Sequence, residues 1–200
     1  IIYYNVDNSD YKNIVSAIDH YTNEKKKIHC LINCAAILLD QPIIKLSMSD
    51  KSLKKLSINN WDKVIKTNLY GTFYISVEVI EKMILSRTNG VIINIGSISS
   101  SGNSGQSSYA ASKAALNALT VTWAQELSNF KIRVNCVAPG MTDTAMPRQA
   151  MSAEHLNAWK NKIPLRRFAE PDEIADAILF CIHNEYFNGR VIEIDGGLRF

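Results

Sequence analysis

The sequence GSISSSGNSGQSSYAASK, residues 96–113, joins two segments of different pattern. Directly before it, VIINI at residues 91–95 is short, apolar and rich in β-branched residues, which is typical of a buried parallel strand. After its Gly/Ser-rich centre, the Ala- and Leu-rich run at 109–127 predicts a helix, because both residue types favour helical backbone. We therefore expect a strand, a loop and a helix here, around which the other segments can be placed.

Tyr109 and Lys113 stand four positions apart, so they share one face of the predicted helix. A phenol keeps its proton at neutral pH, and an ammonium one turn away favours the phenolate, which makes Tyr109 a usable acid or base. Ser97, in the first loop residues after the strand, can reach the same reacting atom. This Tyr–Lys spacing recurs by chance in many helices, so the case for a catalytic site depends on the strand and loop before it.

Strand and helix patterns alternate along the rest of the chain. The expected strands are residues 1–6, 27–35, 91–95, 131–137 and 191–194, and the expected helices are 11–20, 58–69, 71–83, 109–127 and a segment that opens at 170. This alternation predicts an α/β fold with a parallel sheet, in one domain over residues 1–200. Residues 37–57 have no clear period, so we expect a surface excursion with a short helix. The Met-rich stretch 141–165 is expected to form a lid.

The composition is that of an ordinary globular protein. Hydrophobic residues make up 46% and charged residues 20% of the 200 residues, which allows a sizeable core. The net charge of +3 does not indicate a nucleic-acid partner, and no run approaches the roughly 18 apolar residues of a membrane span. Cys30, Cys34, Cys136 and Cys181 form no CxxC pair, so we expect buried thiols in a reducing compartment and no metal site.

Ser97, Tyr109 and Lys113 form a pattern that resembles the short-chain dehydrogenase/reductase family, in which a Ser after a strand is followed by Tyr-x-x-x-Lys on a helix. The similarity is greatest to the branch that includes 3-oxoacyl-[acyl-carrier-protein] reductases. It implies a Rossmann-like α/β fold, with a doubly wound parallel sheet in a three-layer α/β/α arrangement. Ser97 and Ser99 are alternatives for the catalytic serine. We prefer Ser97, because it directly follows the strand end at residues 94–96.

The resemblance implies NAD or NADP as the cofactor, with NADP favoured by the likeness to reductases. Residues 33–36, NCAA, resemble the family's NNAG, with Cys for Asn and Ala for Gly. Asn68 corresponds to the helix Asn that holds a water next to the catalytic Lys. The implied cofactor-binding residues are Asn5, Val6, Asn33, Ala35, Ala36, Tyr109, Lys113, Pro139, Gly140, Thr142 and Thr144.

The family's Gly-rich turn, TGxxxGxG, is absent from these 200 residues. That turn holds the cofactor pyrophosphate at a helix N-terminus, and residues near it choose between NAD and NADP. We expect the family's first strand, helix, strand and helix, on the order of 45–60 residues, to precede Ile1. A chain that lacked them would instead be expected to be a non-catalytic binding or scaffold protein.

The implied reaction is reversible hydride transfer between a nicotinamide cofactor and a carbonyl or secondary alcohol. Ser97 would donate a hydrogen bond to the substrate oxygen and Tyr109 would exchange a proton with it. Lys113 would lower the Tyr109 pKa and hold the ribose, and Asn68 would link Lys113 through water to solvent. The preferred substrate is a 3-oxoacyl thioester, and the alternative is a sugar, polyol or other alcohol.

The resemblance also implies partners. The family's usual assembly predicts a homodimer or homotetramer through the helices around Asn68 and Tyr109, where small side chains allow close packing. These are Ala110, Ala111, Ala114 and Ala115. Five basic residues can either contact an acidic carrier protein or be ordinary surface charges. They are Arg148, Lys160, Lys162, Arg166 and Arg167. We expect a cytoplasmic enzyme with no nucleic-acid or membrane partner.

Overall fold

The computed structural model of the chain describes residues 3–23, 26–47, 49, 51–145, 148 and 151–199. Four parallel strands form its central sheet, in the order β1-β4-β5-β6. They are β1 (Cys30–Asn33), β4 (Gly90–Ile95), β5 (Ile132–Pro139) and β6 (Val191–Ile194). Parallel neighbours need a crossover connection, and each crossover here contains a helix. The expected α/β fold with a parallel sheet is therefore confirmed.

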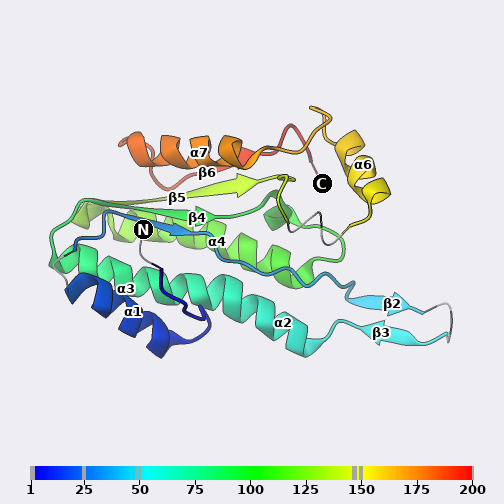
Figure 1. Ribbon diagram of the computed structural model, residues 1–200, viewed down its shortest axis with the longest axis horizontal. Coiled ribbons are helices and arrows are strands. Elements are labelled where there is room, and N and C mark those ends of the chain that lie inside the picture. Colours follow the sequence, from blue (N-terminus) through cyan, green and yellow to red (C-terminus); the bar gives the residue numbers. More distant parts are fainter. Residues whose placement is uncertain are drawn as a thin grey trace.

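Helices cover both faces of this sheet (Figure 1). One face carries α1 (Tyr11–Asn23), α3 (Gly71–Leu85) and α4 (Ser107–Glu126), with α2 (Ile58–Ile65) leading into α3. The opposite face carries α7 (Pro171–His183). Helix α6 (Ala153–Lys162) lies beyond the tip of β5. This is the three-layer arrangement of a Rossmann-like fold.

Neighbouring residues of β4 point to opposite faces of the sheet, as the two-residue period of a strand requires. Ile92 is fully buried against Met83 and Trp123, from the α3 and α4 layer. Ile93 is fully buried in the other cluster, with Ile174 of α7. Because each such side chain contributes about 1.5–3 kcal/mol on burial, the two clusters hold the layers together.

Beside these apolar clusters, a buried network of hydrogen bonds links two strands of the sheet to two helices of one layer. Asn33 Nδ2 donates to Asn94 Oδ1 (2.9 Å) and to Ser76 Oγ (3.0 Å). Asn94 Nδ2 in turn donates to Thr120 Oγ1 (2.9 Å) on α4. The network therefore joins β1, β4, α3 and α4, at the last residue of β1 and the last but one of β4.

We expect Asn94→Ala to lower the free energy of unfolding by about 2–4 kcal/mol, because it leaves buried partners on β1 and α4 without a hydrogen bond. Urea denaturation measures this. Asn157→Ala, on the exposed surface of α6, is the matched control and is expected to stay within about 0.5 kcal/mol of the unmodified protein. A loss of less than about 1 kcal/mol for Asn94→Ala would show that the network does not stabilise the fold.

The predicted helices at 58–69 and 71–83 are one continuous helical element. Ser57 caps its start by accepting a hydrogen bond from the N–H of Asn60. A π-helical segment, Lys66–Tyr70, separates α2 from α3. Such π-bulges shift the side chains that follow them and often occur at functional sites.

Two expectations about the first half of the chain are wrong. Residues 3–6 form no strand, because Tyr4 packs edge-on against His20 of α1, with ring centroids 5.8 Å apart, rather than along the sheet. Ile1 and Ile2 lie outside the described residues. In the predicted excursion at 37–57, the described residues form a β-hairpin instead of a short helix.

In the described part of the chain, no helix is long and apolar enough to cross a membrane.

Candidate active site

The carboxyl ends of β1, β4 and β5 meet at one edge of the sheet, where a cavity of about 470 Å³ opens. Cys34, Ser97 and Gly140, which directly follow or lie just beyond these strands, line the cavity. Tyr109 and Lys113 line it from α4. Ligands of open parallel sheets bind at this edge, and the volume suits a small organic molecule. The structure thus brings together Ser97, Tyr109 and Lys113, three of the four residues predicted to be catalytic, while the fourth, Asn68, does not line the cavity.

Lys113 is a buried ammonium at the base of this cavity. Its side chain is 2% exposed, and its Nζ donates to the carbonyl of Ile95 (2.6 Å) at the end of β4. The same Nζ lies 5.6 Å from the centre of the Tyr109 ring. The predicted one-turn spacing therefore places a cation beside the phenol.

Burial dominates the electrostatics of both side chains. It lowers the pKa of Lys113 to about 8 and raises the pKa of Tyr109 above its usual value. For Tyr109, a hydrogen bond with Ser97 opposes the effect of burial on the pKa, and the negative charge of Asp40 adds to it. Lys113 is predicted to lower the pKa of Tyr109, but the net shift is upward, because desolvation of the phenolate is the largest effect. Tyr109 is thus a protonated phenol at neutral pH, the form that can give up a proton.

Ser97 and Ser99 both lie in the cavity wall. Ser97 hydrogen-bonds to Tyr109, and its Oγ accepts from the N–H of Ser99 (3.1 Å). Ser99 Oγ instead accepts a long bond from Asn103 Nδ2 (3.5 Å). The bond to Tyr109 favours Ser97 as the hydroxyl that can share one substrate oxygen with the phenol.

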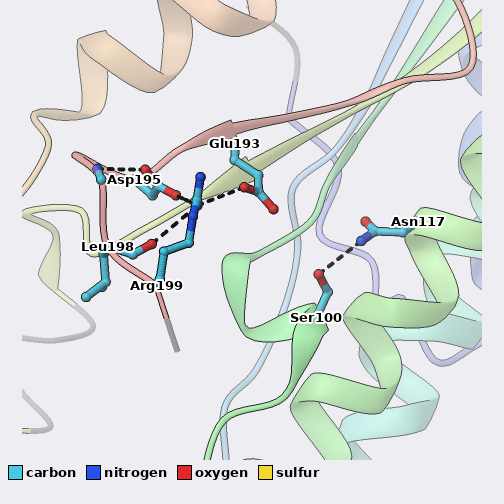
Figure 2. Close-up of polar contacts among 7 residues, drawn as sticks. Ser100, Asn117, Glu193, Asp195, Leu198 and Arg199 are labelled. Atoms are coloured by element: carbon cyan, nitrogen blue, oxygen red, sulfur yellow. Dashed lines mark hydrogen bonds and ion pairs between the residues drawn. The ribbon is translucent and has the colours of Figure 1, made fainter.

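Asn117, one turn beyond Lys113 on α4, fixes the loop that carries Ser97. Its Nδ2 donates to Ser100 Oγ (3.0 Å), in the short 3-10 turn after Ser97 (Figure 2). Its Oδ1 accepts from Cys136 Sγ (3.4 Å) on β5. Sequence reasoning missed Asn117, because its two partners come from distant segments that only the fold brings together.

A second wall joins the loop after β1 to the start of α4. Gln106 Nε2 donates to Asp40 Oδ2 (3.0 Å), and the N–H of Gln41 donates to the carbonyl of Gly105 (2.8 Å). Burial raises the pKa of Asp40, and the bond from Gln106 partly offsets this effect. These contacts place a carboxyl group in the cavity with Tyr109, which no local sequence pattern indicated.

Asn68 is 1% exposed and lies in the π-helical segment Lys66–Tyr70. Its Oδ1 accepts from the N–H of Ile37 (2.8 Å), and its Nδ2 donates to the Ile37 carbonyl (3.0 Å) and to Ser112 Oγ (3.3 Å). A polar residue on an apolar helix face needs such partners. Asn68 therefore braces the loop after β1 and the residue before Lys113, without lining the cavity itself.

The residues predicted to bind a cofactor divide into two groups. Those that line the cavity are Ala36, Tyr109, Lys113, Pro139, Gly140, Thr142 and Thr144. Asn5, Val6, Asn33 and Ala35 do not line it. The Asn33 side chain is turned into the fold, where it donates to Ser76 and Asn94.

The turn after β6 packs directly behind Gly140. A Cβ at Gly140 would lie 2.8 Å from the Asp195 Cα, so only glycine fits at this corner. Asp195 accepts from the N–H of Gly197 (2.8 Å), and Arg199 bonds to both Asp195 and Glu193 (2.9 Å to Glu193; Figure 2). This packing fixes the backbone at Gly140, one of the residues implied to bind the cofactor.

The donor groups around Lys113 fit the nicotinamide and ribose half of a dinucleotide. An ammonium has three N–H donors, and the described residues offer this one a single hydrogen-bond acceptor, Ile95. Its other donors are thus available to ribose hydroxyls. Gly140 and Thr142 also line the cavity, where their polar groups can meet a carboxamide.

The cysteines follow the sequence prediction only in part. Cys136 and Cys181 are buried as expected, and Cys30 is half-buried. Cys34 is exposed and lines the cavity, because β1 ends at Asn33 and leaves Cys34 in the loop beyond it.

Comparisons with known proteins agree with this geometry. A family model described as enoyl-(acyl carrier protein) reductase matches residues 2–199. The chain is 38% identical over 193 residues to a 3-oxoacyl-[acyl-carrier-protein] reductase of Thermotoga maritima. This match covers 95% of this chain and 74% of the relative. It is 35% identical over 201 residues to an acetoacetyl-CoA reductase of Allochromatium vinosum, and this match covers 99% of this chain and 77% of the relative.

A solved structure has the same fold. The gluconate 5-dehydrogenase of Burkholderia cenocepacia, crystallised with NADP and tartrate, is similar with a TM-score of 0.85 at 27% identity. The match covers 96% of this chain and 73% of that chain.

Proposed function

Because the chain belongs to the short-chain dehydrogenase/reductase family of NAD(P)-dependent oxidoreductases, we propose that it reduces the keto group of a 3-oxoacyl thioester. One observation carries the proposal. Lys113, Tyr109 and Ser97 meet in one cavity at the carboxyl edge of the sheet, with the phenol protonated and the ammonium buried beside it. A proton donor, a hydrogen-bond donor and a cation at one point are what carbonyl reduction requires.

Each side chain has a separate task in this mechanism. A nicotinamide cofactor held in this cavity would supply the hydride that the carbonyl carbon accepts. Ser97 donates a hydrogen bond to the substrate oxygen, and Tyr109 gives that oxygen its proton as negative charge develops there. Lys113 holds the ribose, and its charge stabilises the phenolate that remains. We propose that Asn68, which bonds to the residue before Lys113, holds the water that returns a proton to the site.

The cofactor is proposed to extend along the strand ends, within one catalytic domain over residues 1–200. Its nicotinamide half would contact Tyr109, Lys113, Pro139, Gly140, Thr142 and Thr144. Its adenosine half would contact Asn5, Val6, Asn33, Ala35 and Ala36. NADP is favoured over NAD, since the similar gluconate 5-dehydrogenase was crystallised with NADP.

An acyl chain suits the walls on the substrate side of the cavity. Leu38, Ile98, Met141, Met151 and Trp159 line it. Flexible methionines adapt to unbranched apolar groups, whereas a polyol would need more hydrogen-bond partners. The family model's description names an enoyl substrate and the two relatives 3-oxoacyl or acetoacetyl substrates, which share the acyl thioester.

The test is a substrate panel with NADPH and NADH, followed by nicotinamide absorbance. We expect acetoacetyl thioesters to be reduced, in preference to crotonyl thioesters, whose double bond lacks the oxygen that Ser97 and Tyr109 would contact. Oxidation of gluconate or polyols alone would support the alternative alcohol dehydrogenase. No turnover of any substrate by the folded protein would support a non-catalytic scaffold.

The two serines provide a matched pair. We expect Ser97→Ala to lower kcat/KM for the acetoacetyl thioester by about 10²–10³-fold, because one donor to the developing oxyanion is lost. Ser99→Ala, in the same wall but without a bond to Tyr109, is expected to change kcat/KM by less than about fivefold. Steady-state kinetics of both variants checks this, and the reverse ranking would assign the role to Ser99.

The protein is further proposed to be a homotetramer built from dimers. Ala111 and Ala114 are exposed along α4, and Phe73 and Val77 of α3 are 45% and 41% exposed. These small and apolar groups favour close packing of helices between copies. The four free thiols support a reducing compartment, and we propose the cytoplasm.

A further inference from the structure

The hairpin of β2 (Ile44–Leu46) and β3 (Leu53–Lys55) extends away from the body of the molecule (Figure 1). It lies at the end toward which the β5 arrow points, which is the end with the cavity. A two-stranded hairpin alone is at best marginally stable in water. An exposed hairpin of this kind is therefore expected to have a partner.

One face of the hairpin is apolar. Residues opposite each other in an antiparallel pair share a face, so Ile44, Leu46, Leu53 and Lys55 lie together. The three aliphatic side chains are 55%, 54% and 66% exposed, respectively. No described part of the chain covers them.

The other face carries an unfavourable arrangement of charge. Lys45 lies directly opposite Lys54, and like charges at such positions repel. Lys51 and, on the apolar face, Lys55 are also exposed, and none of the four lysines forms an ion pair with a described residue. Asp50 is the one acidic residue that the sequence contains between positions 41 and 58. The hairpin therefore favours a partner that brings negative charge.

The basic residues predicted from sequence to meet a carrier protein already have partners. Arg148 pairs with Asp143 (2.7 Å), Arg167 with Glu173 (2.6 Å), Arg166 bonds to the Asn161 carbonyl, and Lys160 and Lys162 lie over the rings of Phe168 and Trp159 (5.4 and 4.6 Å). The hairpin lysines are thus the better candidates for contacts with an anionic surface.

Gln41 connects the hairpin to the cavity. Its side chain donates to the Lys55 carbonyl (2.8 Å) and accepts from the N–H of Ser57 (3.2 Å), while its N–H bonds to Gly105. The preceding residue, Asp40, lines the cavity. Since Ile44 is four residues from Asp40, the hairpin starts within about 14 Å of the cavity wall.

We propose that this hairpin docks an acidic carrier protein that delivers the thioester substrate to the cavity. The proposal rests on the proposed function, and it adds the partner and its surface. The apolar face of Ile44, Leu46 and Leu53 packs against the carrier, and Lys55 on the same face meets its carboxylates. The long side chains of Lys45 and Lys54 reach around the edges of the two-stranded ribbon to further carboxylates. Attraction between opposite charges speeds the encounter and weakens as salt rises.

Lys54→Glu is the sharpest test, because the new carboxylate faces Lys45 and keeps the hairpin paired while it removes positive charge. We expect kcat/KM for acetoacetyl-acyl carrier protein to fall about tenfold and to lose part of its salt dependence. The value for acetoacetyl-N-acetylcysteamine, an uncharged small thioester, is expected to stay the same. Lys12→Glu, on the exposed surface of α1, is the control and should change neither value.

Direct binding of acyl carrier protein, measured by calorimetry, separates this proposal from the proposed function. Binding that Lys54→Glu weakens supports the docking site even if no thioester is reduced. Reduction of thioesters with carrier binding unchanged in Lys54→Glu overturns the docking site and leaves the reaction intact. An equal loss with both thioesters, a changed oligomeric mass, or binding to anionic lipid vesicles in place of the carrier also overturns it.

Discussion

Tyr109→Phe is expected to lower kcat/KM for the acetoacetyl thioester by about 10²–10⁴-fold, the range that a positioned proton donor contributes. The change removes one oxygen from a side chain that lines the cavity and hydrogen-bonds to Ser97. The ring and its packing against Lys113 remain. We therefore expect cofactor binding and the free energy of unfolding to change little while turnover is lost.

Tyr70→Phe is the matched control for this result. Tyr70 is 46% exposed at the end of the π-helical segment and does not line the cavity. Steady-state kinetics and a NADPH fluorescence titration of both variants separate chemistry from binding. If Tyr109→Phe kept more than about a tenth of the activity, Tyr109 could not be the proton donor.

Lys113→Met is expected to lower activity and to stabilise the fold. Activity should fall by about 10²–10³-fold, because the cation that holds the ribose and stabilises the phenolate is lost. Burial lowers the pKa of Lys113 from 10.5 to about 8, which corresponds to a cost of about 3 kcal/mol for the charged form. The variant also loses one hydrogen bond to Ile95, worth about 1 kcal/mol. The net gain in stability at pH 7 is about 2 kcal/mol.

This gain depends on pH in a defined direction. At pH 7 the lysine is charged in both the folded and unfolded states, so the cost of burial is fully present. Between pH 8 and 10.5 the unfolded chain binds more protons than the folded chain, so the stability of the unmodified protein rises. Urea denaturation at pH 7 and at pH 10 should thus show a smaller advantage for Lys113→Met at the higher pH. A variant less stable than the unmodified protein at pH 7 would contradict this account.

Sequence patterns were sufficient where local chemistry decides the structure. The β-branched run at 91–95 formed a buried strand, and the Ala-rich run after it formed α4 with Tyr109 and Lys113 on one face. Ser97 was predicted from its place after a strand, and the structure puts it beside Tyr109. In each case the determining neighbours lie within about one loop of the residue.

Long-range contacts could not be predicted. Asp40 and Asn117 act through partners on other segments, and neither has a sequence pattern that marks it. The raised pKa of Tyr109 could not be predicted because its main cause is burial, which depends on the whole fold. The hairpin at 44–55 was missed because its strands are three residues long and both are exposed.

The most direct test of the central claim is the transfer of deuterium from NADPH labelled at its transferable nicotinamide position to acetoacetyl-N-acetylcysteamine. We predict that the protein places the label on the hydroxyl-bearing carbon of the product, and that Tyr109→Phe leaves the label on the cofactor. A folded protein that binds NADPH and transfers no label to this thioester would contradict the proposed reaction.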